Sequence, residues 1–365
     1  MRNYDAMEQY WIWLASVPGI GSQKFYRLIG IYEDARNVWD NVDDESMRFL
    51  GEKTLAALRE ARSERYFYAL FSRLEQLGVE VVTRLSDGYP PLLDSIYDPP
   101  AALYVRGNAD LAAERTFAIV GSRRASRDGQ RAAREIAEEL ARHDVTVVSG
   151  LARGIDTCAH EGALSGRGPT VAVLGCGVDV VYPPENERLM GQIIDSGGAV
   201  VSEYVPGTQP LAGHFPARNR IISGLSRGTL LVEGAKGSGA MITVDFAGDQ
   251  GRDVFAVPGG IYSPQSAMPN RLIVEGATPV LSAWEILEYY RWAERPAAVP
   301  GDKAPKPELT EEEQRIVEPL KIEEMSFDEL AAASGIPPAQ LNSHLTILEL
   351  RGIIVKAPGG LYRAY

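Results

Sequence analysis

Short runs of consecutive apolar residues alternate with amphipathic stretches through the middle of the chain. The apolar runs are rich in valine, isoleucine and leucine and occur at residues 117–120, 145–149, 171–174, 200–202, 230–232 and 254–257. Between them apolar residues recur at helical spacing, for example at 128–143, 185–195 and 240–250. Strands buried on both faces of a parallel sheet have such continuous apolar sequences. The alternation therefore predicts a doubly wound, mostly parallel α/β domain over residues 79–295.

The segment before this domain has a different pattern. Residues 1–78 have helical periodicity, interrupted by turn residues, at 4–15, 22–31, 54–61 and 63–77. The first turn, residues 17–21 (VPGIG), is typical of a helix-hairpin-helix or SAM-like domain, in which N–H groups at a helix N-terminus meet a phosphate. A tight turn in a small helical bundle is the alternative interpretation. It is favoured here because only Lys24 and Arg27 add positive charge nearby.

The segment after the α/β domain begins with a change in composition. Residues 296–308 contain four prolines and predict a linker. Residues 309–365 contain helical segments followed by a small hairpin, which is the pattern of a winged helix. This domain has nine acidic and five basic residues, and its predicted recognition helix, 337–350, has no lysine or arginine. Because a major-groove reader needs such donors, we expect a structural or protein-contacting role.

Composition limits the kind of protein this chain can be. Hydrophobic residues make up 45% and charged residues 24%, as in soluble globular proteins. No stretch approaches the ~20 apolar residues of a membrane helix, so no membrane contact is expected. The two cysteines and four histidines lack metal-ligand spacing, which predicts no disulfide framework, no metal and no cofactor. A reducing cytoplasm fits this composition.

Charge is distributed unevenly, although the net charge is −12. Six arginines and one acidic residue lie between 115 and 134, and no acidic residue lies between 204 and 232. Both segments are expected at the carboxyl ends of strands, where such sheets bind ligands. Two basic segments at one sheet edge predict a phosphate-binding groove. Phe215 offers a stacking surface there, which suits an unpaired base better than a duplex.

Single residues in these segments have an alternative interpretation. Arg123 and Asn219 would then satisfy buried carbonyls or pair with Glu203 and Glu233. For any one residue this role is as plausible as phosphate contact. For the cluster, anion binding is favoured, because arginines without partners repel one another.

Signals for an enzyme are weak. The turn after the first strand of the domain has one glycine, Gly121, where a dinucleotide fingerprint has more, and no P-loop motif occurs. Asp156, Cys158 and His160 lie in one predicted helix, a composition compatible with a nucleophile site. We expect instead that Cys158 is a core residue and that Asp156 caps the helix. No catalytic residue is predicted.

Several motifs together resemble the DNA-processing protein A family, DprA/Smf. The resemblance covers about residues 5–295 and, more loosely, the winged helix. It is carried by these segments among others: YPPLL at 89–93, AIVGSR at 118–123, SGLARGID at 149–156, FPARNRIISG at 215–224 and GRDVFAVPG at 251–259.

This resemblance implies a Rossmann-like domain that binds single-stranded DNA without catalysis. It also implies a homodimer that protects incoming DNA and helps to load the recombinase RecA during natural transformation. Carried over by motif, the implied DNA-binding residues are Gly121, Ser122, Arg123, Phe215, Arg218, Asn219, Arg220 and, flanking them, Lys236.

A nucleotide N-glycosidic-bond hydrolase is the rival hypothesis. Enzymes on related Rossmann-like folds use the sequence Pro-Gly-Gly-x-Gly-Thr-x-x-Glu. Here residues 258–260 are Pro-Gly-Gly, but Ile-Tyr-Ser-Pro follows, without the second Gly-Thr or the glutamate. The DNA-binding hypothesis is therefore preferred.

Overall fold

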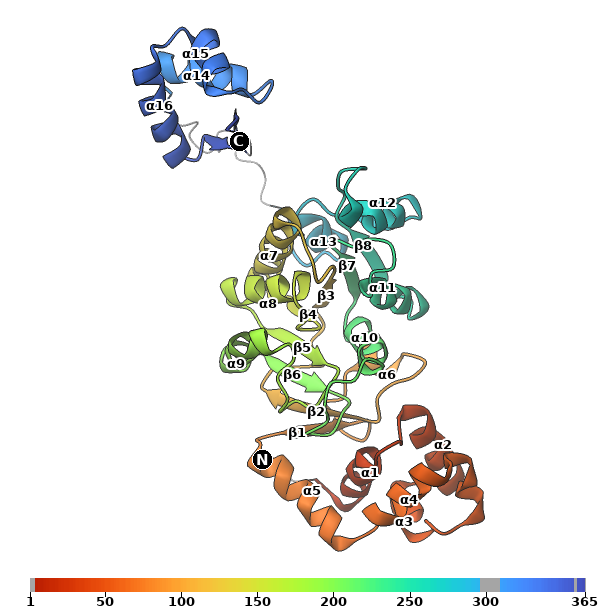
Figure 1. The fold of residues 1–365 in the computed structure, drawn as a ribbon. Coiled ribbons are helices and arrows are strands. Elements are labelled where there is room, and N and C mark those ends of the chain that lie inside the picture. Colours follow the sequence, from red (N-terminus) through yellow and green to blue (C-terminus); the bar gives the residue numbers. More distant parts are fainter. Residues whose placement is uncertain (1–3, 296–308, 358–359, 365) are drawn as a thin grey trace. The chain divides into compact units, whose positions relative to one another are not determined.

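A nine-stranded sheet forms the centre of the larger of two structural units (Figure 1). The computed structural model describes residues 4–295, 309–357 and 360–364. The two units are divided after Arg295, so the N-terminal helices share a unit with the sheet. The predicted linker, residues 296–308, lies outside the described residues.

The sheet is mostly parallel, as predicted. Its strand order is β1-β2-β6-β5-β4-β3-β7-β8-β9. In this order, each strand between β6 and β9 pairs parallel with its neighbours in that range. The strand β2 pairs antiparallel with β1 and with β6. The strand bounds are β1 (Glu80–Thr83), β2 (Ala102–Gly107), β3 (Thr116–Val120), β4 (Thr146–Ser149), β5 (Thr170–Leu174), β6 (Ala199–Ser202), β7 (Gly228–Leu231), β8 (Asp253–Ala256) and β9 (Thr278–Pro279).

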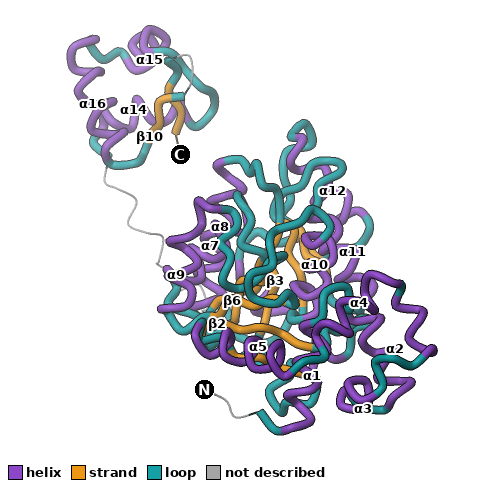
Figure 2. The backbone as a smooth tube through the Cα atoms, turned by 60° about the horizontal axis from the view of Figure 1, so that its bottom comes forward, coloured by secondary structure: helices purple, strands orange, loops and turns teal. Residues whose placement is uncertain are grey.

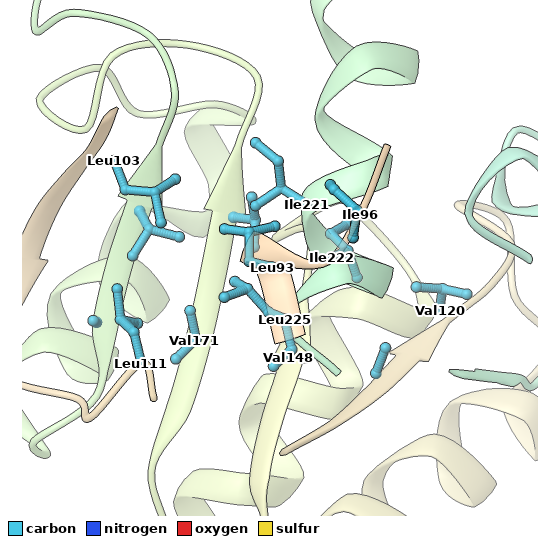
Figure 3. Packing of buried hydrophobic residues seen from close by; sticks show 14 of the residues in the cluster. Leu93, Ile96, Leu103, Leu111, Val120, Val148, Val171, Ile221, Ile222 and Leu225 are labelled. Carbon is cyan, nitrogen blue, oxygen red and sulfur yellow. The ribbon is translucent and has the colours of Figure 1, made fainter. Parts of the chain in front are cut away.

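Helices cover both faces of the sheet because successive strand residues point to opposite sides. In β3, Phe117 and Ile119 pack against α7, α8 and α13. Ala118 and Val120 belong to the cluster with α10 and α11. Figure 3 shows this second cluster, with Val120 labelled. Figure 1 shows α7, α8 and α9 on one side and α10, α11 and α12 on the other. The helices of this domain are α6 (Pro91–Asp94), α7 (Arg127–Arg142), α8 (Ile155–Ser165), α9 (Glu187–Asp195), α10 (His214–Gly224), α11 (Ala240–Asp249), α12 (Ala267–Val274) and α13 (Ala283–Tyr289).

Gly154 lets two loops at the carboxyl edge of the sheet approach each other. It has a φ of 78°, and a Cβ there would lie 2.3 Å from the carbonyl oxygen of Ser122. The neighbouring Ile155 N–H donates to that same carbonyl at 3.2 Å. Glycine is needed because any side chain would separate the β3–α7 and β4–α8 loops.

The N-terminal residues form helices, as predicted, and these helices pack around a core that is rich in aromatic side chains. The indole N–H of Trp11 donates to the carbonyl of Ala101 at 2.8 Å, which ties this bundle to the segment before β2. Figure 2 shows α1 and α5 beside the strands at the β1 edge. The helix α3 was not predicted from sequence. The bounds are α1 (Ala6–Ser16), α2 (Ser22–Tyr32), α3 (Ala35–Asp40), α4 (Glu52–Ala61) and α5 (Glu64–Gln76).

The C-terminal unit has the predicted winged-helix elements, and buried apolar residues of its described part form a core of their own. A capping box of Thr310 and Glu313 begins its first helix. Its elements are α14 (Glu311–Leu320), α15 (Phe327–Ser334), α16 (Pro338–Leu350), β10 (Ile354–Lys356) and β11 (Tyr362–Ala364). None of the helices in the described part of the chain has the length and apolar character that a membrane span requires.

Candidate functional site

A pocket of about 870 Å³ lies at the carboxyl ends of β3 and β7. These adjacent strands mark the point where the chain order of the sheet reverses, because β4 lies on one side of β3 and β7 on the other. Doubly wound sheets bind ligands at such a switch point, where the loops after the two strands diverge. The position of the pocket therefore follows from the topology.

The pocket brings together residues that are far apart in sequence. Its lining includes all the predicted site residues except Arg220. They come from the β3–α7 loop, from α10 and from the loop between β7 and α11: Gly121, Ser122, Arg123, Phe215, Arg218, Asn219 and Lys236.

Arg123 and Phe215 lie beside each other in this pocket. The Arg123 guanidinium is 5.7 Å from the centroid of the Phe215 ring, which is a cation–π arrangement. Arg123 is exposed, and no carboxylate of a described residue forms an ion pair with it. An anion can therefore bind this guanidinium while a flat ring packs near Phe215.

Arg218 is a buried residue of the pocket lining. It is only 4% exposed, and its Nη1 donates to the carbonyls of Gly150, at 2.8 Å, and of Val173. A Cβ at residue 150 would lie 2.6 Å from Nη2, so a side chain there would displace the guanidinium. Burial lowers the pKa of Arg218 to about 10. Its main contacts are thus to buried carbonyls, the role that sequence analysis gave as the alternative for Arg123.

Arg220 points away from the pocket, contrary to the expectation that it joins this site. Its guanidinium pairs with Asp98 at 3.2 Å and with Glu203 at 2.7 Å, and it donates to the hydroxyl of Ser22 at 3.4 Å. The cause is helical geometry: Arg218 and Arg220 are two residues apart in α10, or about 200° around its axis. Phe215 and Arg218, three apart, share a face.

Asp156 is a pocket residue that the sequence analysis did not assign to the site. Its Oδ2 accepts from the N–H groups of Gly150, at 3.1 Å, and Ala152, at 3.4 Å. Burial raises the pKa of Asp156 to about 6, against the opposing charges of Arg218 and Arg123. It does not cap α8, whose N-cap is Gly154. The carboxylate binds the preceding loop instead.

Cys158 and His160 do not form a nucleophile site with Asp156. Cys158 is buried in the core beside α7, as predicted. His160 shares a hydrogen bond of 2.7 Å with the hydroxyl of Thr170, and burial lowers its pKa to about 3. Both side chains are therefore neutral packing residues at neutral pH.

The pocket is predominantly cationic. The lining contains one acidic residue, Asp156, and four basic residues: Arg123, Arg124, Arg218 and Lys236. Arg124 lies in the basic segment 115–134 but was not predicted as a site residue, although its position next to Arg123 is a signal for it. Among the described residues, no cluster of histidine, cysteine or carboxylate side chains could hold a metal ion.

The Pro-Gly-Gly segment of the rival hydrolase hypothesis lies outside this pocket. Asn270 holds its turn, since its Oδ1 accepts from the Gly259 N–H at 3.0 Å and its Nδ2 donates to the Gly259 carbonyl at 2.9 Å. Of the described residues between 258 and 270, Gln265 lines the pocket.

Comparison with known proteins gives consistent matches over both units. The family described as DNA recombination-mediator protein A matches residues 80–291, and the DprA winged helix domain matches residues 300–360. Protein Smf of Escherichia coli is 40% identical over 301 residues, which are 80% of this chain and 79% of that protein. DNA processing protein DprA of Streptococcus pneumoniae is 46% identical over 57% of this chain and 73% of its own length.

Solved structures agree with these matches. The structure of DNA processing protein A from Streptococcus pneumoniae superposes with a TM-score of 0.66 at 36% identity, covering 79% of this chain and 98% of that one. The same protein from Helicobacter pylori, described for its single-stranded DNA binding mode, gives 0.53 at 27% identity over 58% and 95% of the two chains.

Proposed function

Since the chain belongs to the DNA recombination-mediator protein A family, also called DprA or Smf, we propose that it binds single-stranded DNA in the switch-point pocket. The observation that carries this proposal is the pairing of exposed Arg123, free of carboxylate partners among the described residues, with the Phe215 ring. The single-stranded DNA binding mode described for the Helicobacter pylori relative supports it. The proposed DNA-binding residues are Gly121, Ser122, Arg123, Phe215, Asn219 and Lys236, together with Arg124, and the buried Arg218 holds the pocket wall in place.

The chemistry of the pocket favours a single strand over a duplex. An unpaired base exposes a face that can stack near Phe215, while its phosphates meet Arg123, Arg124 and Lys236. In a duplex the base faces are already stacked, so only the phosphate contacts would remain. No catalytic step is part of this proposal.

The test is a comparison of fluorescence anisotropy for a labelled single strand and for its duplex over a series of salt concentrations. We expect tighter binding of the single strand. Its affinity should fall as the salt concentration rises, because the arginine and lysine side chains of the protein displace counterions from the phosphates when they bind. Equal affinity for both forms would contradict the proposal.

We further propose that two copies of the chain associate through the sheet edge near β9. Exposed apolar residues lie in the segment between β8 and the start of α13: Ile261, Tyr262, Val274 and Leu281. Covering such residues with a second copy removes them from water. Tyr262→Glu should lower the molar mass in sedimentation from that of a dimer to that of a monomer. Tyr97→Glu, at an equally exposed tyrosine elsewhere, should leave it unchanged, and a dimeric Tyr262→Glu variant would contradict this interface.

A role in loading RecA, during natural transformation, extends the same proposal. A mediator that holds a single strand in one pocket leaves the rest of the strand open to a second protein. We expect this protein to shorten the lag in RecA filament formation on single-stranded DNA. An unchanged lag with a DNA-bound, dimeric protein would contradict this step.

Truncation after Arg295 should leave single-stranded DNA binding at least as strong as in the full chain. The larger unit keeps its own core without the winged helix. The removed residues are net acidic, and α16 has no lysine or arginine, so their loss removes negative charge from a protein that binds a polyanion. A large loss of affinity in a folded, dimeric truncation would assign DNA contact to the winged helix.

A further inference from the structure

The switch-point pocket contains a carboxylate that phosphate binding does not explain. Asp156 lies among the cations of the lining, and a negative charge there opposes a polyanion. No arginine or lysine nitrogen of a described residue forms an ion pair with this carboxylate. Arg218 and Arg123 act on it only through their charge.

The two oxygens of this carboxylate differ. Oδ2 is occupied by the N–H groups of Gly150 and Ala152. Oδ1 accepts no hydrogen bond from any described residue. It is also absent from the fully buried side-chain atoms that lack a partner, so part of this atom is accessible. The side chain is only 6% exposed and is held in place through Oδ2, so Oδ1 is the atom left to accept a hydrogen bond from a molecule in the pocket that Asp156 lines.

We infer that Asp156 reads the base: its free Oδ1 accepts a hydrogen bond from the exocyclic amine of a cytosine or adenine that packs near Phe215. A carboxylate is the acceptor that suits the N4 amine of cytosine. Thymine has a carbonyl oxygen in the equivalent position, so two acceptors would face each other. This inference rests on the proposed function and adds a preference among bases to it.

The protonation state of Asp156 gives the preference a pH dependence. The groups facing its carboxylate are Arg218 on α10, Arg123 on the β3–α7 loop, and the two loop N–H groups, which favour the ionised form. Burial outweighs them and raises the pKa to about 6. Above this pH the carboxylate accepts from an amine. Below it the protonated group can donate to the thymine carbonyl, so the preference for an amine should decline.

Short single strands of thymine and of 5-methylcytosine test the inference. These bases share the ring and the 5-methyl group and differ along one edge, where thymine has O4 and N3–H and 5-methylcytosine has the N4 amine and an unprotonated N3. At pH 7.5 we expect the 5-methylcytosine strand to bind at least about fivefold more tightly, which is the lower end of the range for one charge-assisted hydrogen bond. At pH 5.5 the ratio should fall toward one. Equal affinities at pH 7.5 would overturn base reading but leave single-stranded DNA binding intact. If neither strand binds, the proposed function fails as well.

Asp156→Asn provides the matched variant. Its amide can donate to thymine, so the preference for 5-methylcytosine should disappear while the thymine strand binds at least as well. Asp128→Asn, at an exposed carboxylate in the first turn of α7, should keep the wild-type ratio. A folded Asp156→Asn protein with the wild-type ratio would overturn the inference. The two-strand comparison in the wild-type protein does not depend on this variant folding.

Discussion

Arg218→Ala is expected to lower the free energy of unfolding by about 2–6 kcal/mol, the range for leaving two buried hydrogen-bond acceptors without their donor at about 1–3 kcal/mol each. The change removes both hydrogen bonds that the guanidinium donates to the carbonyls of Gly150 and Val173. Those carbonyls would be left unsatisfied in the interior, and a cavity would remain beside them. Asp156 would also lose the nearby positive charge that favours its ionised form.

Chemical denaturation followed by circular dichroism measures this loss. Arg188→Ala, at an exposed arginine on α9, is the matched control and should change stability by no more than about 0.5 kcal/mol. If Arg218→Ala is as stable as the control but binds DNA poorly, Arg218 is a direct phosphate contact and not a support for the pocket wall.

Arg123→Ala is expected to weaken single-stranded DNA binding by about 1–3 kcal/mol, which is the range for losing a charge-assisted contact. The side chain is exposed and satisfies no carbonyl or carboxylate of the described residues, so the fold should be unaffected. Because one phosphate contact is lost, the slope of log affinity against log salt should also become shallower by about one. Anisotropy titrations at several salt concentrations measure both effects.

Phe215→Ala is the comparison that separates charge from stacking. It removes a ring without removing a cation, so affinity should fall by a similar amount while the salt slope stays nearly unchanged. The half-buried ring also contacts Tyr182, at 5.2 Å between centroids, and a thermal melt checks that the variant remains folded. An unchanged affinity in folded Arg123→Ala would exclude this arginine from the site.

The fold could be predicted wherever a segment carried its own signal. Buried parallel strands such as β3 and β5 are continuous apolar runs, because helices cover both of their faces. The strand β2 is also almost fully buried, but it was not predicted because it follows directly on a proline-rich loop. Its antiparallel direction depends on its pairing with β6, which lies nearly a hundred residues further along the chain.

The sequence by itself determined the family, the α/β class, the winged helix and the two basic segments that meet at the pocket. These depend on residue type and spacing, which are local properties. Only the tertiary structure decided which arginine faces which partner. Arg218 and Arg220 have the same chemistry and lie in the same helix. One is directed to the carbonyls of Gly150 and Val173, and the other to Asp98 and Glu203. Those partners come from distant segments, so their positions are fixed by packing and not by the sequence around each arginine.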